Sequence, residues 1–129
     1  MAERARSLLS VTGAAEAATG MLLLAAPSVL VDLLLGEAPG SRAGETVTRI
    51  AGVALLALGV GCWLARQDAT SRVADGLVAA MLIYNLGVVL LLAFAWASLR
   101  LSGIGLWPVL LAHAGLAAWC FLCLSSGRE

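Results

Sequence analysis

Four polar side chains lie inside otherwise apolar stretches and are the candidates for chemistry: Glu16, Tyr84, Asn85 and His113. Together they offer a carboxyl, a phenol, an amide and an imidazole, which can hydrogen-bond a small polar ligand. The carboxyl and the imidazole can also take up or release a proton. An ionisable group inside a membrane span costs about 3 kcal/mol on insertion scales, so these residues predict a ligand or proton site. The alternative is that each hydrogen-bonds to a neighbouring helix and serves packing.

The stretches that carry these residues are long enough to cross a membrane. Apolar runs cover about residues 8–35, 47–65, 77–97 and 104–124. A bilayer core near 30 Å thick needs about 20 residues of helix. Because lipid offers no partner for backbone amides, such spans form helices. We predict an all-α fold, an integral membrane four-helix antiparallel bundle forming one transmembrane domain over residues 1–129, with the first helix kinked at Pro27.

Helical geometry places three of the candidates at similar depth. At 1.5 Å per residue from the inner ends of their helices, Glu16 lies about 8–12 Å deep, Asn85 about 12 Å and His113 about 16 Å. They can form one cluster if the helices are suitably rotated. A single His and a single carboxyl do not make a metal site, which needs three or four ligands. We therefore expect no metal and no cofactor.

Asp32 and Arg49 form a second candidate pair. Asp32 lies near the outer end of the first span and Arg49 near the outer start of the second. Adjacent antiparallel helices would bring them to the same depth, which predicts a structural ion pair. An anion-binding role for Arg49 is the alternative.

The composition supports a membrane protein and excludes several functions. The chain is 61% hydrophobic and 12% charged, with a mean hydropathy of +0.98. Such a chain has too few polar groups to cover a water-facing globule. Its net charge is zero, and no basic tract could hold nucleic acid. No nucleotide-binding, hydrolase, metalloprotease or haem-attachment motif occurs, so we expect no enzyme. The three cysteines are expected to be small buried hydrophobic residues: Cys62, Cys120 and Cys123.

Arginines and tryptophans indicate the orientation. Five arginines fall on the side of the termini and the middle loop: Arg4, Arg6, Arg66, Arg72 and Arg128. Three fall on the other side: Arg42, Arg49 and Arg100. This bias places both termini in the cytoplasm.

Trp96 and Trp107 are expected at the outer boundary, Trp63 and Trp119 at the inner one. The absence of Lys and the wealth of Ala, Leu and Gly are typical of a GC-rich bacterium, so we expect a bacterial inner membrane.

Small residues at helical spacing predict close packing of the spans. They form one face of the first span and parts of the second and fourth: Gly13, Ala17 and Gly20; Gly52, Gly59 and the Ala57/Gly61 pair; Ala114 and Ala118.

Several short motifs carry a family resemblance. They are Arg49-Ile50-Ala51-Gly52, Leu58-Gly59 with Trp63, Tyr84-Asn85, and Trp107-Pro108 with His113. The pattern resembles small bacterial four-helix membrane proteins that are DoxX-like in the broad sense. The resemblance implies the four-helix architecture. Some DoxX-related proteins are linked to quinone-dependent sulfur oxidation, but most of the group has no assigned activity.

Three functions fit the sequence. The first is a non-enzymatic accessory or scaffold subunit, surrounded by lipid and packed against a membrane protein partner or a second copy. The second is a small-molecule or proton-coupled transporter or binding protein that uses Glu16, Asn85 and His113. The third is a redox accessory that contacts a quinone near His113 and Trp119. If the polar residues face one another around a cavity, the second function is favoured, and if they face lipid, the first is. If they only hydrogen-bond across tightly packed helices, neither is favoured.

Overall fold

The computed structural model describes residues 2–126 and contains five α-helices and one short 3-10 helix. The elements are α1 (Ala2–Ala25), α2 (Pro27–Leu35), α3 (Arg42–Ala65), η1 (Arg66–Asp68), α4 (Arg72–Leu99) and α5 (Leu106–Ser126). No strand occurs in the described residues, so the all-α prediction is confirmed. Four helices, α1, α3, α4 and α5, are long and apolar enough to cross a membrane. The chain is thus a multi-pass membrane protein by the length and composition of its helices.

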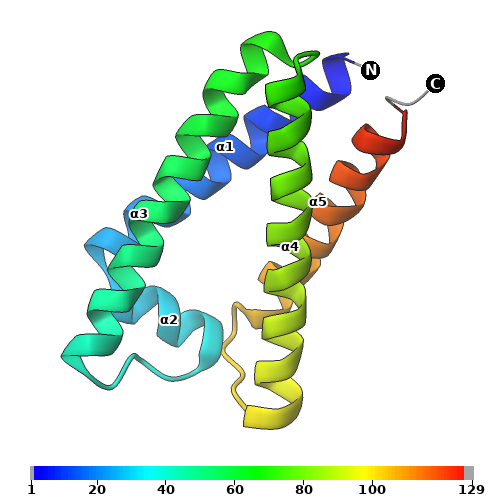
Figure 1. Ribbon diagram of the computed structural model, residues 1–129. Helices are drawn as coiled ribbons and strands as arrows, with labels where there is room; N and C mark the ends of the chain where they lie inside the picture. The colour runs from blue at the N-terminus through cyan, green and yellow to red at the C-terminus, as the bar shows by residue number, and fades with distance from the viewer. Residues whose placement is uncertain (1, 127–129) are drawn as a thin grey trace.

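The four long helices run up and down as two packed pairs. Helix α1 lies along α3, and α4 lies along α5 (Figure 1). The start of α1, the turn η1 and the end of α5 lie at the same end of the molecule (Figure 1). There the pairs share a core made of buried side chains from all four helices: Leu8, Leu9, Cys62, Ala74, Val78, Met81 and Cys120. Arg128, one of the five arginines assigned to this side, lies outside the described residues.

The first span is shorter than predicted, because Pro27 ends the helix instead of kinking it. Helix α1 stops at Ala25, and α2 begins at Pro27 as a separate helix of 9 residues. Ala26 has a non-helical backbone, with φ −141° and ψ 64°. Proline lacks an N–H and disfavours helical geometry in the residue before it, which explains the break. The single helix predicted over residues 8–35 is therefore wrong. Helix α2 instead runs across the bundle at the end opposite the termini (Figure 1).

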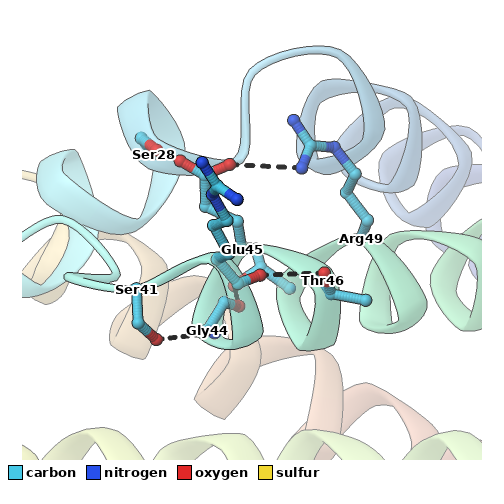
Figure 2. Close-up of polar contacts among 8 residues, drawn as sticks. Ser28, Ser41, Gly44, Glu45, Thr46 and Arg49 are labelled. Carbon is cyan, nitrogen blue, oxygen red and sulfur yellow. Dashed lines mark hydrogen bonds and ion pairs between the residues drawn. The ribbon is translucent and has the colours of Figure 1, made fainter.

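The other three helices begin or end a few residues away from the predicted bounds. Two of them start early because serines cap their first turns. Ser41 Oγ accepts a hydrogen bond from the Gly44 amide at 3.0 Å (Figure 2). Ser71 Oγ accepts one from Ala74 at 3.1 Å. Such caps satisfy amides that have no partner inside the helix, so the helices extend to Arg42 and Arg72.

Glycines bring the backbones of α1 and α3 into contact. A Cβ added at Gly59 would lie 2.6 Å from the Ala17 nitrogen, and one at Gly20 would lie 2.6 Å from the Gly52 carbonyl oxygen. A Cβ at Gly13 would lie 3.0 Å from the Gly59 oxygen. The predicted small-residue face of the first span thus packs against Gly52 and Gly59 of the second. Glycine is needed here because any side chain would push the helices apart. The predicted Ala57/Gly61 pair does not take part, because Ala57 is exposed and a Cβ at Gly61 would reach only Leu77 of α4.

Helix α2 is held by the loop between α4 and α5. The Gly105 amide donates to the Leu33 carbonyl at 2.8 Å, and the Gly103 amide donates to Leu34 at 3.2 Å. These bonds satisfy carbonyls at the end of α2 that have no partner inside the helix. Gly36 ends α2 in the left-handed region, with φ 79°, which glycine adopts without strain.

The start of α2 is tethered to α3. Ser28 Oγ donates a hydrogen bond to Glu45 Oε1 at 3.1 Å (Figure 2). Both ends of α2 are therefore fixed to neighbouring elements, one by a side chain and one by the backbone of a loop.

The two tryptophans predicted at the outer boundary contact each other. The rings of Trp96 on α4 and Trp107 on α5 pack edge to face, with centroids 5.2 Å apart. The guanidinium of Arg66, the first residue of η1, lies over the Trp63 ring near the end of α3, 3.6 Å from its centroid. Each arrangement places aromatic rings near the end of a span, and their position at the membrane boundaries stays a prediction.

Candidate functional site

The four polar candidates converge where α1, α4 and α5 meet. Tyr84 Oη donates a hydrogen bond to Glu16 Oε2 at 3.3 Å. The Tyr84 and His113 rings pack edge to face with centroids 5.6 Å apart. His113 Nδ1 lies 2.7 Å from Asn85 Oδ1. One continuous polar cluster thus links Glu16, Tyr84, His113 and Asn85, so the structure brings together all four candidates from three helices.

Asn85 orients the imidazole and is itself fully buried, at 0% exposure. Its Nδ2 donates to the Met81 carbonyl at 2.7 Å, one turn earlier on α4. The amide must therefore point its oxygen at His113, because the reverse orientation would set two carbonyl oxygens against each other. An amide oxygen only accepts, so His113 Nδ1 carries a hydrogen. In the neutral ring, Nε2 then presents a lone pair, and within residues 2–126 it has no hydrogen-bond partner.

Glu16 is buried without a cation. The residue is 3% exposed, and its Oε1 has no hydrogen bond to any described residue. The only ion pair in the described part of the chain lies elsewhere, between Glu45 and Arg49. Burying a carboxyl with one hydrogen bond and no opposite charge is unfavourable. Such a group, held in a membrane span, points to a function at this position.

A pocket of about 400 Å³ opens beside the cluster. It is lined by Ala15, Glu16, Thr19, Leu30, Leu33, Leu34, Tyr84, Ile104, Gly105, Val109, Ala112, His113 and Leu116. Most of this lining is apolar, and the polar side chains are Glu16, Thr19, Tyr84 and His113. Leu33 is 44% exposed and Ile104 84% exposed, so the pocket reaches the protein surface between α2 and the loop before α5.

Part of this lining was not recognised from the sequence. The side chains of Leu30, Leu33 and Leu34 cover the pocket because α2 turns across the bundle after Ala26. Their apolar type in an apolar stretch gives no signal of this, but Pro27 is a signal of the break that redirects them. Trp119, named with His113 in the quinone hypothesis, does not line the pocket.

Thr12 is a further buried polar residue that the sequence did not single out. It is 1% exposed, and its Oγ1 has no hydrogen-bond partner among the described residues. It lies one turn before Glu16 on α1 but is not part of the pocket lining.

The ion pair predicted between Asp32 and Arg49 does not form in the described residues. Arg49 Nη1 instead pairs with Glu45 Oε2 at 3.3 Å, four residues earlier on α3 (Figure 2). Asp32 is exposed on α2. The break at Ala26 is the reason, because it removes Asp32 from the helix that lies along α3. Oppositely charged residues four positions apart on a helix pair readily, so Arg49 pairs with Glu45.

The cysteines contribute to packing. Cys62 and Cys120 are buried in the shared core, Cys123 is half-buried, and all three are free thiols. Within residues 2–126, no group of three or more His, Cys, Asp or Glu side chains is placed to hold a metal ion.

Comparison with known proteins finds no match to a protein-family model, to a curated protein or to a solved structure. The resemblance to DoxX-like proteins therefore stays a prediction.

Proposed function

We propose that this protein binds, within the membrane, a small and mainly apolar molecule that carries one polar group. The observation that carries the proposal is that Glu16, Tyr84 and His113, from three helices, all line one pocket whose other side chains are apolar except for Thr19. Pockets with this composition, a few placed polar groups in an apolar surround, are typical of small-molecule sites. The proposal includes transport of the bound molecule, alone or together with a proton, through the same residues.

The arrangement of the polar residues favours binding over a scaffold role. Had Glu16, Asn85 and His113 pointed toward lipid, a protein partner would have been needed to cover them. They face one another instead, across three helices of one chain, so no partner subunit is needed to cover them. We keep the proposal non-enzymatic, because the chain carries no recognised catalytic signature.

The same proposal places the protein in a bacterial cytoplasmic membrane, with both termini in the cytoplasm. The support is the arginine bias, which is four against three in the described residues. The end that holds the start of α1 and the connection between α3 and α4 carries Arg4, Arg6, Arg66 and Arg72, and the other side carries Arg42, Arg49 and Arg100. Arginine and lysine are enriched on the cytoplasmic side of membrane proteins.

Native mass spectrometry tests this proposal directly. The protein would be extracted gently from its own membrane, as wild type, as His113→Ala and as Gly115→Ala. Gly115 lies on α5 two residues from His113, and a Cβ there meets nothing within 4 Å. We expect a small-molecule mass on wild type and on Gly115→Ala, and its loss on His113→Ala.

Two other results would contradict the proposal. A co-purifying protein at fixed stoichiometry, with no small molecule, would support the accessory-subunit function. A bare chain in all three samples would remove the evidence for a resident ligand.

A further inference from the structure

The hydrogen-bond donors and acceptors that line the pocket restrict what it can bind. The hydroxyl hydrogen of Tyr84 is used by Glu16, and the Nδ1 hydrogen of His113 is used by Asn85. What these two residues and Glu16 leave toward the pocket is a set of acceptors: Glu16 Oε1 of the ionised carboxyl, the Tyr84 lone pairs and, in the neutral ring, His113 Nε2. The fourth polar group of the lining, the Thr19 hydroxyl, can donate or accept. A carbonyl or ether oxygen entering the pocket would meet acceptors on three side chains. A ligand with donor groups would meet partners.

The charge of the pocket points the same way. Glu16 is its only acidic lining residue, and the lining contains no Arg. Every arginine of the described chain lies outside this lining, and the one that forms an ion pair is engaged with Glu45. An anionic ligand would therefore meet a like charge or a buried carboxyl without any cation to offset it. A cationic ligand would supply the opposite charge that Glu16 lacks.

Resting on the proposed function, we propose that the ligand is an amphipathic amine. Its protonated nitrogen donates hydrogen bonds to Glu16 Oε1 and His113 Nε2. Its apolar body lies against the leucines of α2 and α5, Leu30, Leu33 and Leu116. Hydrogen bonds between ionised partners are about twice as strong as neutral ones, so the nitrogen fixes the orientation while the apolar surface adds affinity.

Three probes with one apolar body and different polar groups separate this inference from the proposed function. Radiolabelled phenylpropylamine, phenylpropanol and phenylpropanoate would be measured by equilibrium dialysis against the full chain in lipid nanodiscs. Empty nanodiscs correct for partitioning into lipid. We expect the amine to bind at least about tenfold more tightly than the alcohol, since its charged bond to Glu16 is the stronger one. The carboxylate should show no saturable binding.

Glu16→Gln is the matching variant, because the amide oxygen can still accept from Tyr84. In this variant the affinity for the amine should fall to that for the alcohol, and the affinity for the alcohol should stay within about threefold of the wild-type value. Asp75→Asn is the control, since Asp75 is exposed at the start of α4 and lies outside the pocket lining, and it should change neither affinity. The amine-to-alcohol ratio on wild type decides the question even if Glu16→Gln fails to fold.

The remaining outcomes are distinct. If alcohol and amine bind equally, and Leu116→Trp weakens both by filling the pocket, the proposed function stands and the amine inference is overturned. If the carboxylate binds best, the inference is likewise overturned. If none of the three probes shows saturable binding, both the inference and the proposed function fail.

Discussion

Helix α1 presents two different faces, and the contrast between them explains why the fold is tightly packed on one side of this helix and hollow on the other. One face carries Gly13, Ala17 and Gly20 and lies against the backbone of α3. The other carries Glu16 and, one turn on, Thr19, and it lines a pocket of about 400 Å³. Small residues let two backbones touch and leave no space between them. On the pocket side, residues of α2, α4 and α5 line the space beside α1 in which we place the ligand.

The largest effect is expected on the glycine face. Gly59→Ala would place a Cβ 2.6 Å from the Ala17 nitrogen and 2.8 Å from the Gly13 oxygen, so α1 and α3 must separate. We expect the free energy of unfolding to fall by about 2–3 kcal/mol, as for an overpacked core. Denaturation in mixed detergent micelles, followed by circular dichroism, measures it. Gly115→Ala is the control and should be neutral or stabilising by up to about 1 kcal/mol, because alanine favours helix and the site is open. Equal effects of the two changes would refute the contrast.

A second effect is expected where α2 is held over the pocket. A Cβ at Gly103 would collide with the Leu33 carbonyl group. Gly103→Ala should therefore weaken the bond from the Gly105 amide to Leu33 and lower stability by about 1–3 kcal/mol. Hydrogen exchange of peptides covering residues 101–106 should become faster. Gly40→Ala, also in a loop but with nothing within 4 Å, should leave exchange unchanged. Unaltered exchange in Gly103→Ala would mean that the loop does not hold α2.

A third effect is expected at Asn85, which does not line the pocket but orients His113, which does. Asn85→Leu removes the 2.7 Å contact to His113 and frees the imidazole to turn. We expect a loss of about 1–2 kcal/mol in stability, between the values for buried bonds in water and in membranes. A double-mutant cycle with His113→Ala isolates the coupling of the pair. A coupling energy near zero would show that Asn85 does not orient His113.

The smallest effect is expected at the exposed ion pair. Arg49 and Glu45 have side chains that are 46% and 39% exposed. Arg49→Gln should change stability by less than about 0.5 kcal/mol. Glu45→Gln should do slightly more, because Ser28 also donates to this carboxylate. Thermal denaturation of both variants measures this, and a larger loss in Arg49→Gln would reverse the order of importance.

The sequence predicted the spans well, because membrane crossing depends on the length of apolar runs. It also identified the small-residue faces of α1 and α3, and the polar residues that turn out to be neighbours. Three features depended on tertiary structure. The rotation that brings Glu16 to Tyr84 was not predictable, because these helices are apolar on all sides and give no periodic signal. The full break before Pro27 was expected only as a kink. The pairing of Arg49 with Glu45 in place of Asp32 followed from that break.

Recognition of the proposed ligand depends on one atom above all, Nε2 of His113, which we expect to face the pocket as a hydrogen-bond acceptor. The chain contains a single histidine, so labelling histidine with nitrogen-15 gives one imidazole spectrum in nanodiscs. We predict that Nδ1 carries the hydrogen in the free protein, and that the Nε2 resonance moves when phenylpropylamine is added. A hydrogen on Nε2 in the free protein, or an Nε2 resonance unmoved by the amine, would show that His113 Nε2 does not accept a hydrogen bond from the ligand.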